Sequence, residues 1–306
     1  MKRIVFIVNP AAGNGRAQSK WQTIRPQLTL QHEVYVTEFP RHGVALAREI
    51  CAVKKETLLI VIGGDGTVHE VIEGCAGAAH VSITLLSAGS GNDFARTFTA
   101  VQSAKEIEQL ASDSTKKQLM RMGNIATKIQ QAIFVNNTGF GFDAKVVFET
   151  NRSLWKRRLN RFGLGKLAYY GVVVKEMLSY RPSAMELVVE HQTYRFQNVW
   201  FVVVCNQPYF GGGMKISPKS NPEDDTLEVT VVANISRWKL LLLFGTVFIG
   251  WHTKIKAVHS FSGTLFQFSF AETTIGHADG EYCGELKPGE RAEVKLLPQT
   301  WAMPVK

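Results

Sequence analysis

The chain has 306 residues, of which 45% are hydrophobic and 20% are charged. This composition is typical of a globular protein and excludes wholesale disorder, and at about 150 residues per domain the length predicts two domains. Lys and Arg number 35 against 26 Asp and Glu, which gives a net charge of +9. The surplus favours an anionic partner such as a nucleotide, a nucleic acid or a membrane surface, without choosing between them.

The cysteines are few and widely separated: Cys51, Cys75, Cys205 and Cys283 form no Cys-x-x-Cys pair. This spacing argues against a zinc site or a disulfide framework. It predicts reduced, mostly buried thiols, as in a cytosolic protein.

Two apolar stretches bear on export and membrane insertion. The run from Ile4 to Val8 is shorter than the roughly 7–15 apolar residues of a signal peptide, and it predicts a strand. The stretch from Leu240 to Trp251 is shorter than the ~20 residues of a membrane-spanning helix, and it predicts a buried helix that enters a strand. We therefore expect a cytoplasmic protein, at most peripherally associated with the inner face of the membrane.

The first third of the chain alternates between predicted strands and helices. Strands are predicted at Ile4 to Val8, Glu33 to Thr37, Thr57 to Ile62 and Ile83 to Leu86. Helical spacing of apolar residues is found through Trp21, Ile24 and Leu28, from Val44 to Val53 and from Val68 to Cys75. Continuous apolar strands between helices are typical of a parallel sheet that is covered on both faces.

Beyond about residue 130, strand-like runs dominate. They are predicted at Ala132 to Asn137, Met185 to Glu190, Tyr194 to Cys205, Thr226 to Ala233, Thr264 to Phe270 and Arg291 to Leu297. Turn residues separate these runs, so we expect a mainly antiparallel domain. The predicted domains are residues 1–128 and 129–306, and the last residues are candidates for returning to the first domain.

Three glycine-containing turns follow strands of the first domain, where parallel sheets bind ligands. The turn from Asn9 to Arg16 has small residues whose N–H groups could approach an anion, although many ordinary turns look similar. The turn from Ile62 to Thr67 places three glycines around Asp65, which allows close approach to phosphates and lacks the Walker A sequence. The alternative for Asp65 is a helix cap. In the turn from Gly89 to Arg96, Ser90 offers a hydroxyl, and the alternative is again a cap.

Six sequence blocks occur in an order and near a spacing that resembles the diacylglycerol kinase catalytic domain family, most closely its small bacterial lipid kinases. They are Asn9-Pro-Ala-Ala-Gly, Gly63-Gly-Asp-Gly-Thr-Val-His-Glu, Gly89-Ser-Gly-Asn-Asp-Phe-Ala-Arg, Gly211-Gly-Gly-Met-Lys-Ile-Ser-Pro, Pro222-Glu-Asp-Asp-Thr-Leu-Glu and Ala278-Asp-Gly-Glu. The resemblance covers nearly the whole chain. It implies an N-terminal α/β Rossmann-like domain of the NAD kinase and diacylglycerol kinase type, followed by a C-terminal β-sandwich domain.

The resemblance also implies roles for individual residues. Asp65 would act on the phosphates of ATP through Mg²⁺, and Glu281 would be the general base that takes the proton of a lipid hydroxyl. From the residues alone, a solvated acid of a hairpin turn is the preferred interpretation of Glu281. The implied nucleotide-binding residues are Asn9, Pro10, Ala11, Ala12, Gly13, Thr37, Gly63, Gly64, Asp65, Gly66, Thr67, Val68, His69 and Ser90.

A second Mg²⁺ is implied in the acidic loop of the second domain. The resemblance makes Asp224 a carboxylate ligand and Asn221 and Thr226 carbonyl donors, and the alternative is a simple solvated loop. The chain departs from the family pattern at three positions. Asp225 stands where Gly is usual, His69 where Asn is commoner, and Arg121 where relatives often carry Asp.

A basic run with interleaved aromatic and apolar residues follows residue 150. Its cations are Arg152, Lys156, Arg157, Arg158, Arg161 and Lys166, and Trp155, Leu159 and Phe162 lie among them. A solvated helix face is the ordinary interpretation of such a run. With a lipid substrate expected, we favour docking onto anionic phospholipid headgroups. No nucleic-acid-binding motif accompanies the run, so we expect no nucleic-acid partner.

The sequence thus predicts an ATP-dependent lipid kinase, with diacylglycerol as acceptor and phosphatidic acid as product. Sphingosine and phosphatidylglycerol stay open as acceptors. NAD kinases share the Gly-Gly-Asp-Gly core but lack the later blocks, and a silent lipid-binding regulator is the non-enzymatic alternative. A homodimer is also left open.

Overall fold

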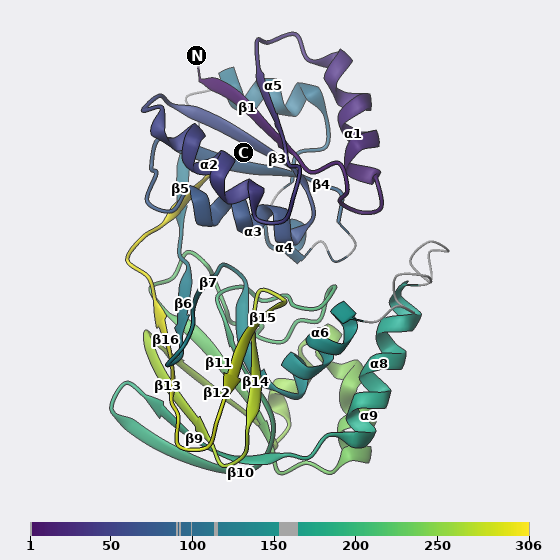
Figure 1. Ribbon diagram of the computed structural model, residues 1–306, viewed down its shortest axis with the longest axis vertical. Helices are drawn as coiled ribbons and strands as arrows, with labels where there is room; N and C mark the ends of the chain where they lie inside the picture. The colour runs from purple at the N-terminus through teal and green to yellow at the C-terminus, as the bar shows by residue number, and fades with distance from the viewer. Residues whose placement is uncertain are drawn as a thin grey trace.

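The computed structural model describes residues 2–89, 91, 93–98, 100–112, 116–152 and 165–305, with residues 165–170 described for their backbone alone. The chain forms two units, one above the other in Figure 1, each built around a β-sheet. Ser90 and residues 153–164 of the predicted basic run lie outside the described residues.

Within the described residues, the first unit has a six-stranded sheet in the order β2-β1-β3-β4-β17-β5. Strands β2, β1, β3 and β4 are mutually parallel, as predicted. Their bounds are β1 Arg3–Val8, β2 Glu33–Val36, β3 Thr57–Gly63 and β4 Val81–Ser87. The helices of this unit are α1 Arg16–Ile24, α2 His42–Ala52, α3 Asp65–Gly74, α4 Asp93–Thr97 and α5 Ala104–Ser112, and a short 3-10 helix, η1 Arg25–Gln27, follows α1.

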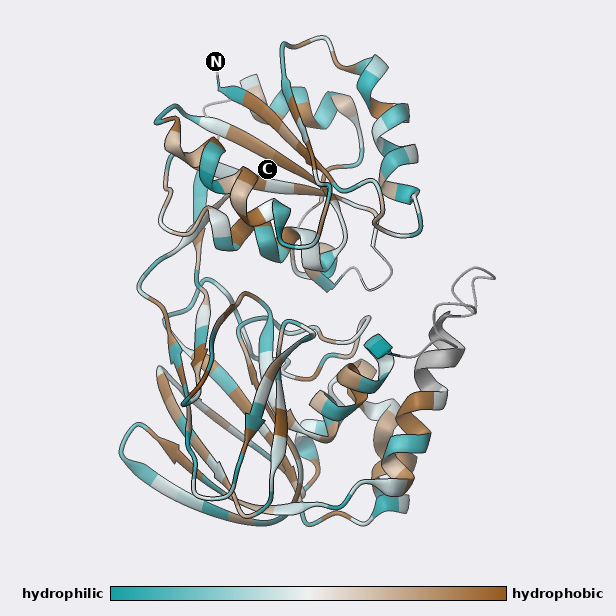
Figure 2. Cartoon of the chain, in the orientation of Figure 1, coloured by the Kyte–Doolittle hydropathy of each residue, from teal (hydrophilic) through white to brown (hydrophobic). Residues whose placement is uncertain are grey.

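The central strands β1 and β3 are mostly apolar because both faces of the sheet are covered there, whereas the edge strand β2 is largely exposed. Every residue of β3 is buried, and Figure 2 shows brown over much of the central strands of the first unit. Val5 and Leu59 face the core beneath α2 and α3, whereas Phe6 and Ile60 face the core beneath α1 and α5. Because successive side chains of a strand point to opposite faces of the sheet, each strand contributes side chains to both cores.

The chain leaves and re-enters the first sheet at one edge. Strand β5, Lys117–Met120, pairs antiparallel with the C-terminal strand β17, Trp301–Pro304. Strand β17 also lies parallel to β4, through Ala302 and Ser82. The C-terminal strand consequently belongs to the first sheet.

The second unit is an antiparallel sheet in the order β15-β14-β8-β10-β9-β13-β16-β6-β7, with β11 and β12 continuing from β10. It folds around a large apolar core, with two smaller apolar clusters beside it, and the predicted sandwich is confirmed. Its strands are β6 Gly123–Ala126, β7 Gln131–Phe134, β8 Asn137–Gly141, β9 Ser183–Val189, β10 Gln192–Cys205, β11 Leu227–Ala233, β12 Val258–Gly263, β13 Leu265–Phe270, β14 Thr274–Ala278, β15 Glu281–Leu286 and β16 Ala292–Leu296. Helices α6 Phe142–Arg152 and α8 Gly165–Ser179 pack together at its side (Figure 1).

Two predicted elements were wrong. The single strand expected at 132–137 is two strands, β7 and β8, separated by Val135 and Asn136. The stretch 240–251 enters no strand; it lies in helix α9, Arg237–Leu243, and the 3-10 helices η2, Phe244–Ile249, and η3, Trp251–Lys254. This stretch is partly exposed rather than buried, because it covers the outside of the second unit.

The predictions for the cysteines and for membrane insertion can also be compared with the structure. All four cysteines are buried free thiols, as predicted. Among the described helices, none is long and apolar enough to cross a membrane.

Candidate active site

The first predicted turn is tied to the second by Asn9. The Asn9 amide nitrogen donates to Thr67 Oγ1 at 2.9 Å, and its carbonyl oxygen accepts the Ala11 N–H at 3.1 Å. The Asn9 N–H donates to the Ile62 carbonyl at the end of β3. Asn9 thus fixes the turn after β1 against the turn after β3.

The first turn is also fixed to the third. Gly13 has φ +61°, and a Cβ there would lie 2.0 Å from the Ala88 carbonyl oxygen, so only glycine fits. Arg16 donates from its guanidinium to the carbonyls of Gly13 and Gly89, each at 3.0 Å. The three turns therefore meet at one edge of the sheet, as their positions after parallel strands predict.

Asp65 lies where the second and third turns meet. It occupies the first turn of α3, and its Oδ1 accepts the Phe94 N–H at 3.3 Å. A Cβ on Gly91 would lie 2.8 Å from Asp65 Oδ2, so the third turn approaches the carboxylate closely because it has glycine there. A carboxylate beside helix N–H groups and glycine turns is suited to a cation-bridged phosphate.

The other predicted nucleotide-binding residues differ in what they can present. Val68 is 2% exposed and belongs to the core, so its side chain cannot reach a ligand. Thr37 and Thr67 are buried, and the Thr37 N–H is bonded to the Val8 carbonyl. Gly66 is exposed and Gly64 is partly exposed, so their backbone groups remain accessible. Pro10, Ala11 and Ala12 form the partly exposed rim of the first turn.

Asp279 joins the two units, a role that the sequence did not reveal. Asp279 and Gly280 have φ +47° and +85°, as the two-residue hairpin turn between β14 and β15 requires. The Asp279 carboxylate accepts the N–H groups of Val135 at 2.7 Å, Asn136 at 2.9 Å and Asn137 at 2.8 Å. Its Oδ2 also lies 2.6 Å from His69 Nδ1, across the boundary between the units.

His69 is held between two carboxylates. Besides Asp279, Glu73 lies 3.6 Å from its Nε2, and its side chain is only 12% exposed. Burial by itself lowers the pKa of His69, but the hydrogen bonds and charges of Asp279 and Glu73 outweigh burial and raise the pKa to about 10. The hydrogen bond from His69 lowers the pKa of Glu73 to about 2, with Arg41 acting in the same direction and burial opposing it. His69 is therefore a cation at neutral pH and acts as an ionic clasp between the units.

A second contact between the units involves glycines. The Gly212 N–H donates to Asp93 Oδ2 at 2.8 Å, and Asp93 is 6% exposed. Burial raises the pKa of Asp93, while the Gly212 N–H and the Arg96 charge act in the opposite direction. Gly213 packs against the Arg96 guanidinium. The Gly211–Gly213 block thus docks onto the third turn, beside Asp65.

Glu281, the predicted base, is the first residue of β15 and is exposed. It pairs with Ala278 across the hairpin whose turn holds Asp279. The Asn151 amide donates to the Gly280 carbonyl at 2.9 Å, which ties this hairpin to the end of α6. The Glu281 carboxylate is therefore accessible to a hydroxyl group that reaches the hairpin from solvent, and it could take the proton of that hydroxyl.

An apolar cavity of about 80 Å³ lies in the second unit, beneath α9 and η2. Its lining is apolar except for Asp143 and His252. Asp143 Oδ2 bonds to His277 Nε2 at 2.9 Å, but Asp143 Oδ1 and His252 Nδ1 have no hydrogen-bond partner among the described residues. Unpaired buried acceptors are costly, so the cavity favours an occupant that carries a donor.

The lining of the cavity is linked to the contacts around Asp65 through packed residues. Phe210 lines the cavity and stacks on His277, with ring centroids 5.7 Å apart. Phe210 also pairs with Met214 across the glycine block that binds Asp93. His277 is two residues before Asp279 in β14. A chain of packed residues therefore links the cavity lining to the hairpin and to the third turn.

The predicted metal loop is bonded within the protein. Asn221 donates from its side-chain amide to Asp224 Oδ1 at 2.9 Å, and its backbone carbonyl accepts the Asp224 N–H. Asp225 pairs with Arg121, so two departures from the family pattern contact each other. Thr226 is partly exposed at the end of the loop. Side chains of this loop therefore bond to protein partners at Asn221, Asp224 and Asp225.

More generally, in the part of the chain that the structure describes, no group of three or more His, Cys, Asp or Glu side chains could hold a metal ion. The assignment of Asn221, Asp224 and Thr226 as ligands stays a prediction.

The two units and their connected turns define a class, the two-domain kinases with an NAD kinase-like β sandwich. The family model "Diacylglycerol kinase catalytic domain" matches residues 3–123, and "YegS C-terminal NAD kinase beta sandwich-like domain" matches residues 136–303. The chain therefore belongs to the diacylglycerol kinase catalytic domain family and is a kinase of the lipid kinase type.

Individual relatives agree with this assignment. The chain is 32% identical to a Bacillus subtilis (strain 168) protein named "Putative lipid kinase YtlR", over 93% of this chain and 94% of that protein. It is 26% identical to a Mycobacterium tuberculosis (strain ATCC 25618 / H37Rv) diacylglycerol kinase, over 97% of this chain and 93% of that protein.

Solved structures share the fold. A diacylglycerol kinase from Bacillus anthracis str. Sterne has TM-score 0.69 at 17% identity, covering 100% of this chain and 97% of that chain. The structure of yeast NADH kinase complexed with NADH has a TM-score of 0.56 at 12% identity, and the match covers 100% of this chain and 84% of that chain.

Proposed function

We propose that the chain transfers the γ-phosphoryl group of ATP to the hydroxyl of diacylglycerol, which gives phosphatidic acid. The observation that carries this proposal is a chain of contacts: the Gly211–Gly213 block bonds to Asp93 in the third turn, and Phe210 and Met214 on either side of this block line an apolar cavity. A nucleotide site alone would serve many kinases. An adjoining apolar cavity favours an acceptor with a hydrocarbon tail.

The nucleotide would lie against the three turns. Accessible N–H groups at Gly64 and Gly66 and the N-terminus of α3 favour phosphate oxygens. Asp65 is the carboxylate suited to hold Mg²⁺ there, and a bound Mg²⁺ would supply charge neutralisation to the phosphates. His69 would add positive charge behind Asp279 without reaching solvent.

The acceptor hydroxyl must lose its proton as it attacks. Glu281 would take this proton, because its carboxylate is exposed on the hairpin that contacts the first unit. The apolar cavity would receive part of an acyl chain. In this arrangement the clasp between His69 and Asp279 sets the position of Glu281 relative to the phosphates.

A second acceptor class is favoured by one specific observation. The unpartnered oxygen of Asp143 and the unpartnered nitrogen of His252 would both accept hydrogen bonds. Burial lowers the pKa of His252, which keeps its imidazole neutral and its Nδ1 an acceptor. A long-chain amino alcohol such as sphingosine carries donors for these atoms, whereas the esters of diacylglycerol do not.

We also propose that the enzyme acts at the inner face of the membrane, with the basic run that begins at Arg152 on anionic headgroups. Arg152 lies over the Phe148 ring, and Phe148 contacts Tyr282, the neighbour of Glu281. The start of the run is therefore close to the proposed base. This supports delivery of the lipid headgroup to the hairpin.

The proposal is tested by two variants and one matched control. Asp65→Asn and Glu281→Gln should each lower transfer of labelled phosphate to diacylglycerol by at least a hundredfold while the unfolding temperature is unchanged. Glu285→Gln, an exposed acid on the same strand, should keep wild-type turnover. Wild-type turnover by Glu281→Gln would remove the proposed base.

A further inference from the structure

The segment from Arg237 to Lys254, which we name the α9–η3 cover, is apolar on two faces. On its inner side, Leu240, Leu243, Phe244 and Val247 line the apolar cavity. A surface helix of a water-soluble protein normally shows polar residues on its other face. The outer face of this cover departs from that rule.

The outer face exposes large apolar side chains. Trp238 is 68% exposed, Leu242 82%, Ile249 66% and Trp251 62%. Trp238 and Leu242 are four residues apart in α9, so they lie on the same side of that helix. Nothing in the described chain covers these four side chains. A continuous segment with this exposure is typical of an interaction surface.

The charge of the cover indicates what it contacts. The sequence contains no Asp or Glu between Val229 and Ala271, and in the same stretch it has Arg237, Lys239, Lys254 and Lys256. The Lys254 ammonium lies 5.6 Å from the centre of the Trp251 ring. Tryptophan and lysine at the edge of an apolar surface are typical of segments that lie in a membrane interface.

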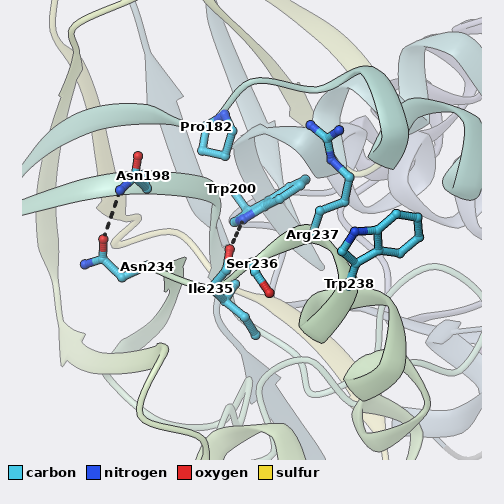
Figure 3. A pocket seen from close by; sticks show the side chains of 8 residues that line it. All are labelled: Pro182, Asn198, Trp200, Asn234, Ile235, Ser236, Arg237 and Trp238. Carbon is cyan, nitrogen blue, oxygen red and sulfur yellow. Dashed lines mark hydrogen bonds between the residues drawn. The ribbon is translucent and has the colours of Figure 1, made fainter.

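A polar hollow of about 520 Å³ adjoins the first turn of the cover. Figure 3 shows Arg237 and Trp238 beside this hollow, with the Trp200 indole bonded to the Ile235 carbonyl at 2.9 Å. Arg237 donates to the Tyr180 carbonyl at 3.0 Å, and its Nε has no partner among the described residues. A guanidinium held in this way beside an exposed indole suits the phosphate of a lipid headgroup.

We propose that the α9–η3 cover docks on an anionic lipid bilayer, with Leu242 and Ile249 inserted among the acyl chains and the four cations at the headgroups. This contact uses residues other than those of the basic run at 152–166 and adds an apolar component to membrane binding. That the cover also admits a lipid tail to the cavity rests on the proposed function; the docking itself does not.

A second copy of the chain is a poorer occupant. A two-fold dimer through this face would bring the same patch of each copy together. It would place two sets of four cations opposite each other, without an acid from either cover to pair them. An anionic bilayer satisfies the same cations and the apolar side chains together.

The test is co-sedimentation of the full chain, without ATP, with vesicles of phosphatidylcholine and phosphatidylglycerol. Replacing Leu242 and Ile249 together by Ser should weaken binding about a hundredfold, since burying each such side chain contributes about tenfold. The matched control is Ile129→Ser, a 78% exposed residue in the β6–β7 turn, which should bind as wild type. Unchanged vesicle binding by the Leu242 and Ile249 double variant would overturn the proposal. The proposal would also be overturned if the double variant lost a dimer present in the wild type but kept its vesicle binding.

A second measurement covers the case in which the double variant fails to fold. Brominated phosphatidylcholine in the vesicles quenches tryptophans that enter the bilayer. In a Trp155→Phe background, which removes the tryptophan of the basic run, the conservative pair Trp238→Phe and Trp251→Phe should remove most of the remaining quenching, and unchanged quenching would contradict the docking. Transfer of phosphate in detergent micelles is measured separately, so a failure of docking and a failure of the proposed function give different results.

Discussion

Replacing His69 by Gln would remove the cation of the clasp between the units. The pKa of this histidine is about 10 in the folded protein against an ordinary value of 6.5. Because the folded state binds the proton more tightly, the clasp is fully present below about pH 6.5 and is lost as the pH rises through 10. At about 1.4 kcal/mol per pKa unit, it contributes about 4–5 kcal/mol at pH 6 and about 2 kcal/mol at pH 8.5. The lowered pKa of Glu73 describes the same ion pair from its other side, so the two contributions are not added.

The assay is denaturant unfolding of the wild type and His69→Gln across this pH range. The difference in unfolding free energy between the two proteins should shrink by about 2–3 kcal/mol from pH 6 to pH 8.5. The control is His191→Gln, which replaces an exposed histidine in the turn between β9 and β10. It should change neither the free energy of unfolding nor its dependence on pH. A difference between wild type and His69→Gln that stays constant with pH would refute the ionic clasp.

Three further predictions concern the turns, the acidic loop and the cavity. Gly13→Ala should lower the free energy of unfolding by at least 2 kcal/mol and the affinity for ATP tenfold, because the new Cβ would meet the Ala88 carbonyl. Gly15→Ala is the control: this position has φ +88° but open space around it, so the substitution should cost about 1 kcal/mol in thermal unfolding. EDTA should leave the unfolding temperature unchanged, and a fall of the unfolding temperature in EDTA that Mg²⁺ reverses would show a metal at the loop. Arg121→Ala should lower the free energy of unfolding by at most about 1 kcal/mol, because the ion pair between Arg121 and Asp225 is exposed. Val247→Phe should raise the KM for long-chain acceptors several-fold with the KM for ATP unchanged, and equal effects on short-chain acceptors would contradict an acyl cavity.

The sequence predicted the parallel half of the fold because its strands are continuous apolar runs between helices. Strand β3 and the Asp65 turn that follows it combine local pattern and local chemistry, so both could be located from the residues alone. Short strands such as β5 and β17, four residues each, carry too weak a pattern. They form because residues 117–120 and the C-terminal residues 301–304 pair with each other, which is a long-range property.

The same limit applies to the site. Asp279 looks like a solvated hairpin acid, and its role depends on partners at residues 69 and 135–137. Arg121 and Asp225 each look like an isolated departure from a family pattern, yet they pair across 104 residues. Leu240 to Trp251 was predicted to be buried because it is apolar, but exposure depends on what the rest of the chain covers.

Phosphoryl transfer to a lipid hydroxyl is the central claim, and a comparison of acceptors tests it most directly. The purified chain would be incubated with labelled ATP and Mg²⁺ and, separately, with micelles of diacylglycerol, sphingosine or phosphatidylglycerol, or with NAD in solution. We expect label in the lipid fraction, with diacylglycerol the best acceptor. Label in NAD alone, or no label in any acceptor, would contradict the account.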